Sequence, residues 1–190
     1  MNQFANINPY PTLEVQYQQN FLTPEECKRV IYESHISHEN QGTFGHRETV
    51  DKGIRDTYVK HLSPSPVNTW LFQKISNSVY HANMQFYRFD LTTLSEVQLL
   101  EYNVGGFYDW HTDCSLRGNN GITRKLSVVI FLSDPSEYDG GYLVLGNNKK
   151  FGMPQGMLVI FPSFLSHKVE PVRRGKRHTL VAWIHGPMFK

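Results

Sequence analysis

The segment RKLSVVIFLSD (Arg124–Asp134) is a β-rich run, with β-branched and aromatic residues at its centre and Asp-Pro closing it. Runs of the same kind fill much of the chain after residue 85, and Gly, Pro, Asn and Asp separate them. They read QFYRFDL, SEVQLLEYN, GGYLVLG, GMLVIFPS, HKVEPV and RHTLVAWIHG. Seven short strands at this spacing predict an antiparallel sandwich or barrel of the jelly-roll type.

Two helices are expected ahead of this β-rich region. The first is FLTPEECKRVIYES (21–34), where Thr23 is the N-cap and Glu26 completes a Thr-x-x-Glu capping box. The second is VNTWLFQKISNSVYHANMQF (67–86), whose apolar residues recur at helical spacing. The remaining segments are predicted as an edge strand at 13–17, a mobile loop at 39–53 and a short strand at 54–62.

These elements give an α+β fold class that is mainly β, with the helices packed outside a jelly-roll core. We expect a single domain over residues 1–190, because a chain of this length is large enough to bury one core. Within it, residues 1–85 are predicted as a helical support region. Residues 86–190 are predicted as the β-core, where the chemistry is expected.

The composition bears on the kind of partner. A net charge of +2 offers little attraction for nucleic acid or for an anionic membrane surface. No apolar run approaches the length of a bilayer-spanning helix, and the N-terminal residues lack the apolar centre of a signal peptide. Cys27 and Cys114 give no disulfide framework. The sequence therefore predicts no nucleic-acid or membrane partner, and a reducing cytosol as the location.

His111 and Asp113, in the segment YNVGGFYDWHTDCS (102–115), are the first candidate site. In a strand, residues two apart point to the same face, so both side chains can project into one barrel mouth. His167 opens another predicted strand and can supply a third ligand. Two histidines and a carboxylate form the facial triad that binds Fe(II), but the same set can also hold a catalytic zinc ion.

Arg177 favours the iron alternative. It lies ten residues after His167, across the RRGK turn, so an antiparallel hairpin would bring it beside the metal without making it a ligand. A fixed guanidinium inside a barrel suits a bidentate grip on a carboxylate. A zinc hydrolase does not require this cation, whereas an oxygenase with a dicarboxylate co-substrate does.

The order of these motifs resembles that of the Fe(II)/2-oxoglutarate-dependent dioxygenases, in particular the prolyl 4-hydroxylase-like group. The likeness runs through YxxGxxYxxHxD (102–113), FLSDPSEYDGGYLVL (131–145), HxVxPVxxGxR (167–177) and Trp183. About half of the chain follows the pattern closely. The segments FLSDPSEYDGG and HKVEPVRRGKR are most similar to bacterial and phage members.

The resemblance implies a double-stranded β-helix in which His111, Asp113 and His167 hold Fe(II). The co-substrate 2-oxoglutarate would chelate the iron and place its distal carboxylate on Arg177, and Tyr102 would line its pocket. O₂ is the other co-substrate, and ascorbate is a candidate reductant that the protein would bind.

One position departs from the family pattern. Some eukaryotic prolyl hydroxylases offer a tyrosine hydroxyl to the distal carboxylate from the strand that here contains Phe131. Thr179 and Lys125 are the candidates for replacing this donor, so Thr179 joins Arg177 and Tyr102 in the expected co-substrate site. Which of the two side chains replaces the hydroxyl stays open at this stage.

Three further residues are assigned to the substrate pocket. Tyr108 and Trp183 match family positions near the metal, and a role as core aromatics is open for both. Arg55 lies on a predicted strand ahead of the barrel, where it can line the substrate entrance or form a surface salt bridge.

The expected reaction is hydroxylation of an unactivated C–H bond, with a prolyl residue in a peptide or protein as the first substrate hypothesis. The alternatives are the same chemistry on a small molecule, such as a free amino acid or metabolite, and a non-catalytic β-helix binding domain. A nucleic-acid demethylase is disfavoured, because such relatives carry a second arginine where this chain has Trp183. The bacterial and phage likeness points to a bacterial or phage-infected cytosol, and the oligomeric state stays open.

Overall fold

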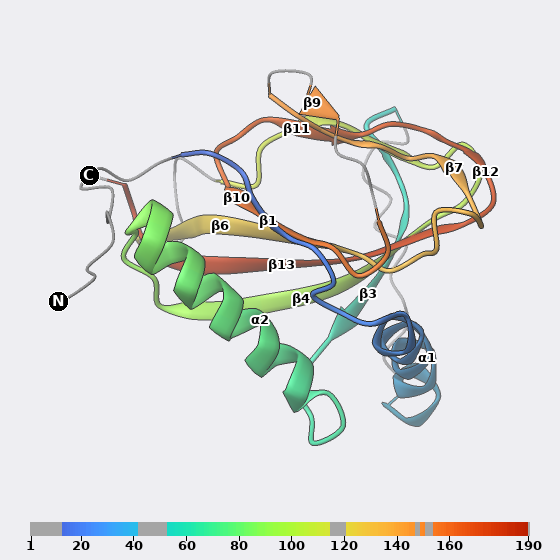
Figure 1. Ribbon diagram of the computed structural model, residues 1–190, viewed down its shortest axis with the longest axis horizontal. Helices are drawn as coiled ribbons and strands as arrows, with labels where there is room; N and C mark the ends of the chain where they lie inside the picture. The colour runs from blue at the N-terminus through green and yellow to red at the C-terminus, as the bar shows by residue number, and fades with distance from the viewer. Residues whose placement is uncertain (1–12, 42–52, 115–120, 147–148, 151–153, 190) are drawn as a thin grey trace, which may run out of the picture.

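The structure is a computed structural model that describes residues 13–41, 53–114, 121–146, 149–150 and 154–189. The described strands form two main layers, and the helices α1 and α2 lie outside the larger layer (Figure 1). All strand pairs among these residues are antiparallel. The jelly-roll core with helices packed outside it is therefore confirmed.

The larger layer is a six-stranded sheet that places the last described strand near its middle. In spatial order its strands are β1 (Gln16–Gln18), β10 (Leu158–Pro162), β6 (Ile122–Phe131), β13 (Arg177–Pro187), β4 (Thr93–Tyr102) and β3 (Tyr58–Leu62). β13 pairs with β6 on one side and with β4 on the other, over nine registered residues each. Residues on these three long strands are thus held in a fixed register.

The smaller layer is a five-stranded sheet, and a two-stranded ribbon accompanies it. The sheet runs β2 (Arg55–Asp56), β5 (Phe107–His111), β11 (His167–Val169), β8 (Leu143–Leu145) and β9 (Lys149–Lys150). The ribbon pairs β12 (Val172–Arg174) with β7 (Asp139–Gly140). The ribbon becomes important below because it lies next to the start of β13.

The helices follow the sequence signals with altered ends. α1 (Pro24–Gln41) starts with the predicted capping box: the Thr23 N–H donates to a Glu26 carboxylate oxygen at 2.9 Å, and the Glu26 N–H donates to the Thr23 hydroxyl at 3.1 Å. α1 extends past the predicted end at residue 34 and takes up the first residues of the predicted loop at 39–53, of which 42–52 lie outside the described residues. α2 spans Thr69–Ala82. Neither described helix is long and apolar enough to cross a membrane.

The segment QFYRFDL, predicted as a strand, is not one. Its first residues belong to η1 (Asn83–Tyr87), a π-helical turn that continues α2 and ends at Arg88 in the left-handed conformation. The Asn83 side chain then holds the exit, because its amide N–H donates to the Phe89 carbonyl and its oxygen accepts from the Phe89 N–H, both at 2.9 Å. The aromatic residues that suggested a strand pack the turn instead: Tyr87 is buried, and its hydroxyl donates to the carbonyl of Ile160 at 2.9 Å.

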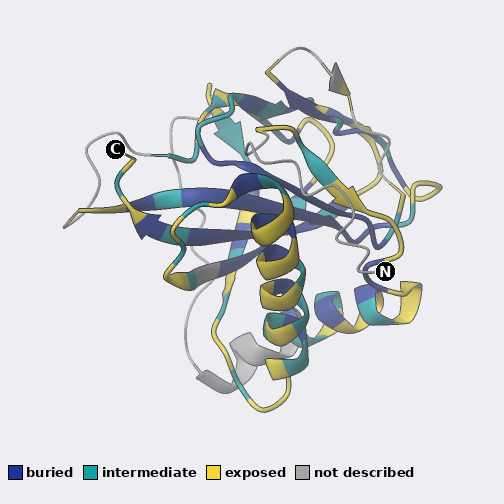
Figure 2. Cartoon of the chain, turned by 60° about the vertical axis from the view of Figure 1, so that its left-hand side comes forward, coloured by how far each residue is buried: buried dark blue, intermediate teal, exposed yellow. Residues whose placement is uncertain are grey.

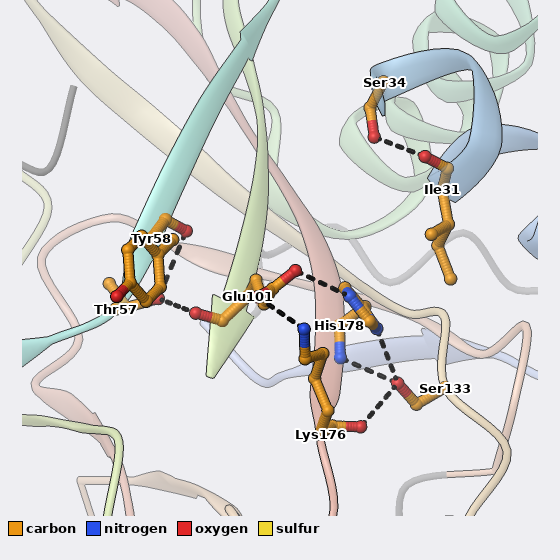
Figure 3. Close-up of polar contacts among 8 residues, drawn as sticks. All are labelled: Ile31, Ser34, Thr57, Tyr58, Glu101, Ser133, Lys176 and His178. Atoms are coloured by element: carbon orange, nitrogen blue, oxygen red, sulfur yellow. Dashed lines mark hydrogen bonds and ion pairs between the residues drawn. The ribbon is translucent and has the colours of Figure 1, made fainter. Parts of the chain in front are cut away.

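The predicted strand at 54–62 splits into β2 and β3, which join different sheets. The break falls at Thr57, whose hydroxyl donates to the Glu101 carbonyl at 3.0 Å (Figure 3). Together with β1, these strands show that residues 1–85 do more than support the core. They supply both edges of the six-stranded sheet and one edge of the five-stranded sheet, so the predicted boundary at 86 does not separate support from core.

Period-two alternation assigns the two faces of the six-stranded sheet to different tasks. On β6, Leu126, Val128 and Ile130 face the helices, and the residues paired with Val128 and Ile130 across β13 and β4 share that cluster: Val97, Leu99, Leu180 and Ala182. Val129 and Phe131 face the other sheet, in a second cluster with Leu100, Val181 and Trp183. Figure 2 shows this as buried strands beneath an α2 whose outer side is exposed. The face of the six-stranded sheet that looks toward the other sheet also carries buried polar side chains, among them Ser127, Arg177 and Thr179.

Candidate metal centre and co-substrate pocket

A pocket of about 350 Å³ lies between the two main sheets. Strands β4, β6 and β13 line it from one sheet, and β2, β5, β8 and β11 line it from the other. Its described lining includes every residue that the sequence assigned to the site: Arg55, Tyr102, Tyr108, His111, Asp113, His167, Arg177, Thr179 and Trp183. The fold thus brings all nine predicted site residues to one cavity.

His111, Asp113 and His167 meet at one end of the pocket. β5 and β11 are paired with His167 directly opposite His111, and Asp113 follows two residues after the end of β5. Asp113 Oδ1 lies 3.8 Å from His111 Nε2, and Asp113 Oδ2 lies 3.5 Å from His167 Nε2. Atoms bound to one first-row metal ion at about 2.1 Å lie within about 4.2 Å of each other, so these spacings suit a shared ion.

The remaining ring nitrogens of the two histidines are already engaged. His111 Nδ1 donates to the Asp109 carbonyl at 2.7 Å, and His167 Nδ1 donates to the Leu165 carbonyl at 3.0 Å. A histidine that donates from Nδ1 keeps a lone pair on Nε2, which is how metal-binding histidines are usually oriented. Burial, followed by repulsion from His167, lowers the pKa of His111 to about 4, so the ring is neutral and ready to ligate near pH 7.

Asp113 is held as a carboxylate. Burial alone would raise its pKa, but attraction to His167 and hydrogen bonds from Ser127 and Trp183 bring that pKa below the ordinary value. The Ser127 hydroxyl donates to Asp113 Oδ2 at 2.7 Å and lies 2.9 Å from the Ser163 hydroxyl. The backbone N–H of Asp113 donates to the Ser163 carbonyl at 2.9 Å, so both the side chain and the main chain are fixed.

Arg177 occupies the other end of the pocket, at the start of β13. It is 1 % exposed, and among the described residues no hydrogen-bond partner reaches its Nε. Its Nη1 lies 3.5 Å from the Thr179 hydroxyl, and its guanidinium also donates to the hydroxyls of Tyr102 and Tyr138. Burial lowers the pKa of Arg177, yet a guanidinium stays charged in proteins. A buried cation that lines a pocket fits a ligand carboxylate.

The structure separates the two candidates for the donor missing at Phe131. Thr179 lies directly opposite Phe131 in the β13–β6 pair, lines the pocket and contacts Arg177. Lys125 is not among the described lining residues, and its Nζ lies 3.6 Å from the centre of the Phe189 ring. Thr179 and Tyr102 therefore offer hydroxyl groups beside Arg177 within the pocket lining, whereas Lys125 does not line the pocket.

The three residues assigned to the substrate pocket line its metal end. The Tyr108 ring stacks on the His111 ring, with ring centres 3.5 Å apart. The Arg55 guanidinium packs over the same Tyr108 ring, 4.6 Å from its centre. Trp183 does more than form a wall, because it donates a side-chain hydrogen bond to Asp113.

Three residues at or beside the site escaped the sequence reasoning. Ser127 is the polar residue in an otherwise apolar stretch of β6, and that pattern was the signal that could have revealed it. Arg124 lies over Trp183, 3.9 Å from its ring centre, and lines the pocket. Tyr138 contacts Arg177 from outside the described lining, and only its position before the Gly140-Gly141 turn set it apart in the sequence.

These residues fit the groups that the resemblance implies. Two imidazoles and one carboxylate offer three ligands around a common point, which leaves further positions for an octahedral metal such as Fe(II). The buried guanidinium of Arg177, which lines the pocket, is where a distal carboxylate would bind. The donor set and the buried cation lie in the same cavity, as a bidentate chelator with a distal carboxylate requires.

The comparison with protein families gives one match. Residues 97–185, from β4 through β13, match the 2OG-Fe(II) oxygenase superfamily. The PKHD-type hydroxylase YbiX of Shigella sonnei is 35 % identical over 147 residues, which cover 71 % of this chain and 64 % of YbiX. The chain spans between about two fifths and two thirds of the length of the curated relatives it matches first.

Solved structures share the fold. A prolyl-4-hydroxylase of Pseudomonas putida superimposes with a TM-score of 0.70 at 22 % identity, covering 90 % of this chain and 91 % of that one. A prolyl hydroxylase of Trichoplax adhaerens, in complex with a hypoxia inducible factor peptide fragment, gives 0.70 at 18 % identity, covering 91 % and 84 %. In sequence, residues 97–185 are therefore similar to the 2OG-Fe(II) oxygenase superfamily, and in fold most of the chain is similar to these prolyl hydroxylase structures.

Proposed function

We propose that the chain is an Fe(II)- and 2-oxoglutarate-dependent dioxygenase that hydroxylates an unactivated C–H bond, with a prolyl residue in a peptide or protein as substrate. One observation carries the proposal: a single cavity holds the ligand set His111, Asp113 and His167 at one end and the buried cation Arg177 at the other. A metal-binding module without this chemistry has no need of the buried cation.

The chemistry balances with the groups named. Oxidative cleavage of 2-oxoglutarate to succinate and CO₂ supplies two electrons, hydroxylation of the C–H bond supplies two more, and one O₂ is reduced. One oxygen atom enters succinate and the other enters the product hydroxyl. Bound Fe(II) supplies the activation of O₂. Ascorbate stays a candidate for keeping the iron reduced.

The protein's own residues hold and orient the reactants. His111, Asp113 and His167 hold the metal, Arg177 binds the distal carboxylate, and Tyr102 and Thr179 offer hydroxyls beside it. Because the walls around Arg177 are apolar residues of both sheets, the charge pair forms away from water, where it is strongest. The Tyr108 ring covers His111 and limits the approach to the metal to the open side of the pocket.

Two observations support a peptide or protein substrate. The P. putida structure is a prolyl-4-hydroxylase, and the T. adhaerens structure holds a peptide. A small molecule is the second candidate, because Arg55 and Arg124 line the same pocket. Guanidinium groups suit a carboxylate such as that of a free amino acid.

A cytosolic location remains part of the proposal. Cys27 is buried and Cys114 is partly buried, and both are free thiols. Free thiols are the usual state of cysteine in a reducing compartment.

The test is turnover by the purified chain with Fe(II), 2-oxoglutarate and O₂. Succinate should form in step with the gain of one oxygen atom in a proline-containing peptide library, read by mass spectrometry. His111→Ala should abolish both signals, while His81→Ala, an exposed histidine on α2, should leave them intact.

The outcomes separate the candidate functions. Oxygen gain in a metabolite extract but in no peptide would replace the peptide hypothesis with the small-molecule one. Binding of Fe(II) and 2-oxoglutarate without succinate from any substrate pool would leave only a binding domain.

A further inference from the structure

The side chain of Arg177 rests on a glycine. A Cβ atom built on Gly141 would lie 2.6 Å from Arg177 Cδ and 3.4 Å from its Nε, and Gly141 has a φ of +63°. Both the space and the backbone conformation therefore require glycine at this position. The segment that contains Gly141 thus packs directly against the Arg177 side chain and forms a floor for it.

This segment, residues 133–141, is fixed to the strands around Arg177. β7 pairs with β12, and the Gly141 N–H donates to the Pro171 carbonyl at 3.0 Å. The Arg173 guanidinium binds both carboxylate oxygens of Asp139 at 2.9 Å. At the other end, the Ser133 hydroxyl accepts the His178 N–H at 2.7 Å, as Figure 3 shows. The segment is therefore a rigid support for the residues that it carries.

Tyr138 is the residue of this support that reaches the guanidinium. It is 5 % exposed, and its hydroxyl accepts a hydrogen bond from Arg177. Tyr102 accepts another hydrogen bond, so two phenol groups interact with the guanidinium. Tyr102 lines the described pocket, whereas Tyr138 does not. A ligand in the pocket could touch Tyr102 but would meet Tyr138 only through Arg177.

We infer that Tyr138 is a positioning residue for co-substrate binding: its hydroxyl and the Gly141 floor hold the Arg177 guanidinium in the orientation that grips the distal carboxylate of 2-oxoglutarate. The inference rests on the proposed function. An arginine side chain has several rotatable bonds, and holding it in one geometry before the ligand arrives removes an entropic cost from binding.

The test compares Tyr138→Phe with Tyr142→Phe. Tyr138→Phe keeps the ring and removes one hydroxyl. Tyr142, the residue after this segment, packs against Lys150 and serves as the control. Each protein is loaded with Mn(II) without O₂ and titrated calorimetrically with 2-oxoglutarate. A second titration uses 2-oxopentanoate, which has the same chelating end and chain length but a methyl group in place of the distal carboxylate.

Tyr138→Phe should weaken 2-oxoglutarate binding about tenfold, the size expected for one hydrogen bond to a charged group. Binding of 2-oxopentanoate should change less than about twofold, because that ligand makes no use of the guanidinium charge. Tyr142→Phe should leave both affinities unchanged. In turnover, the KM for 2-oxoglutarate should rise with kcat nearly constant.

Two results would overturn the inference alone. Equal weakening of both ligands by Tyr138→Phe would show a general structural role, and unchanged affinity for 2-oxoglutarate would show no role. Failure of the wild-type, metal-loaded protein to bind 2-oxoglutarate would instead overturn the proposed function, and the inference with it.

Discussion

The two ends of the pocket are built in different ways. At the metal end, each histidine is oriented by a carbonyl two residues earlier in the chain, Asp109 for His111 and Leu165 for His167. At the guanidinium end, Arg177 is held by Tyr102, Tyr138 and Gly141, which come from distant parts of the sequence. Local geometry therefore prepares the metal ligands, whereas long-range packing prepares the cation.

The two ends also differ in what their charges require. The three metal ligands form a partly exposed cluster, in which a neutral imidazole and a carboxylate need only a cation to be satisfied. Arg177 is a buried cation that needs an anion, and within the described residues it has hydroxyl partners only. The difference predicts that the metal end tolerates the absence of its ligand at little cost, while the guanidinium end is strained until an anion binds.

The largest expected effect is at the metal end. Asp113→Ala removes the one anionic ligand and leaves the donors of Ser127 and Trp183 facing a void. Affinity for Mn(II) or Fe(II), measured by anaerobic calorimetry, should fall by more than about 100-fold, since even second-layer changes cost 10–100-fold. Metal binding within a few-fold of wild type would mean that the ion, if bound, lies elsewhere.

Arg177→Met separates the two ends. Metal affinity should be unchanged, while binding of 2-oxoglutarate to the metal-loaded protein should weaken about 100-fold, because a buried charge pair loses one partner. The ligand-free protein should melt at a higher temperature than wild type, because an apolar side chain replaces a buried, incompletely bonded cation. A lower melting temperature would contradict the description of this end as strained.

Ser127→Ala tests how far the metal end depends on its surroundings. The loss of the hydrogen bond to Asp113 Oδ2 should lower metal affinity about tenfold. Ser76→Ala, on the exposed side of α2, is the matched control. An affinity equal to wild type in Ser127→Ala would indicate that Trp183 alone orients the carboxylate.

Glu101→Gln gives the smallest effect and concerns stability beside Arg177. Glu101 binds Lys176 at 2.8 Å and His178 at 3.2 Å (Figure 3), and hydrogen bonding to His178, opposed by burial and aided by Lys176, lowers its pKa from 4.5 to about 2. A depressed carboxyl pKa contributes stability that is complete above pH 4.5 and is lost as the pH falls toward 2. Chemical denaturation should therefore show wild type more stable than Glu101→Gln by on the order of 2 kcal/mol at pH 7, with the gap closing by about pH 2. A gap that is the same at pH 7 and pH 2.5 would contradict the assignment.

The parts of the fold and site that depend on short-range pattern were predictable. The capping box of α1, most strands of the β-core and the shared face of His111 and Asp113 follow from neighbouring residues, while His167 was found from the order of the motifs. Arg177 was found because a turn of fixed length separates it from His167. Apart from His167, the signal in each case is local, and the physics that produces it acts over a few residues.

The parts that were missed depend on contacts between distant segments. QFYRFDL has the aromatic content of a strand, but the buried hydroxyl bond of Tyr87 and the Asn83 side chain favour a π-helical turn. Tyr138 and Gly141 matter only because β7 lies against β12, and no pattern within their own segment shows that pairing. The position of Lys125 on its strand suggested it as a hydrogen-bond donor to the distal carboxylate. Its ammonium group instead packs against the Phe189 ring, and Lys125 does not line the described pocket.

The place of β13 has a consequence for how the protein is made. The last described strand in the chain is inserted between β6 and β4, which both precede it. During synthesis these two strands must therefore wait with open edges until residue 187 has left the ribosome, and open strand edges favour aggregation. The same strand delivers both Arg177 and the Trp183 that supports Asp113, so neither end of the pocket is complete until β13 has joined the sheet.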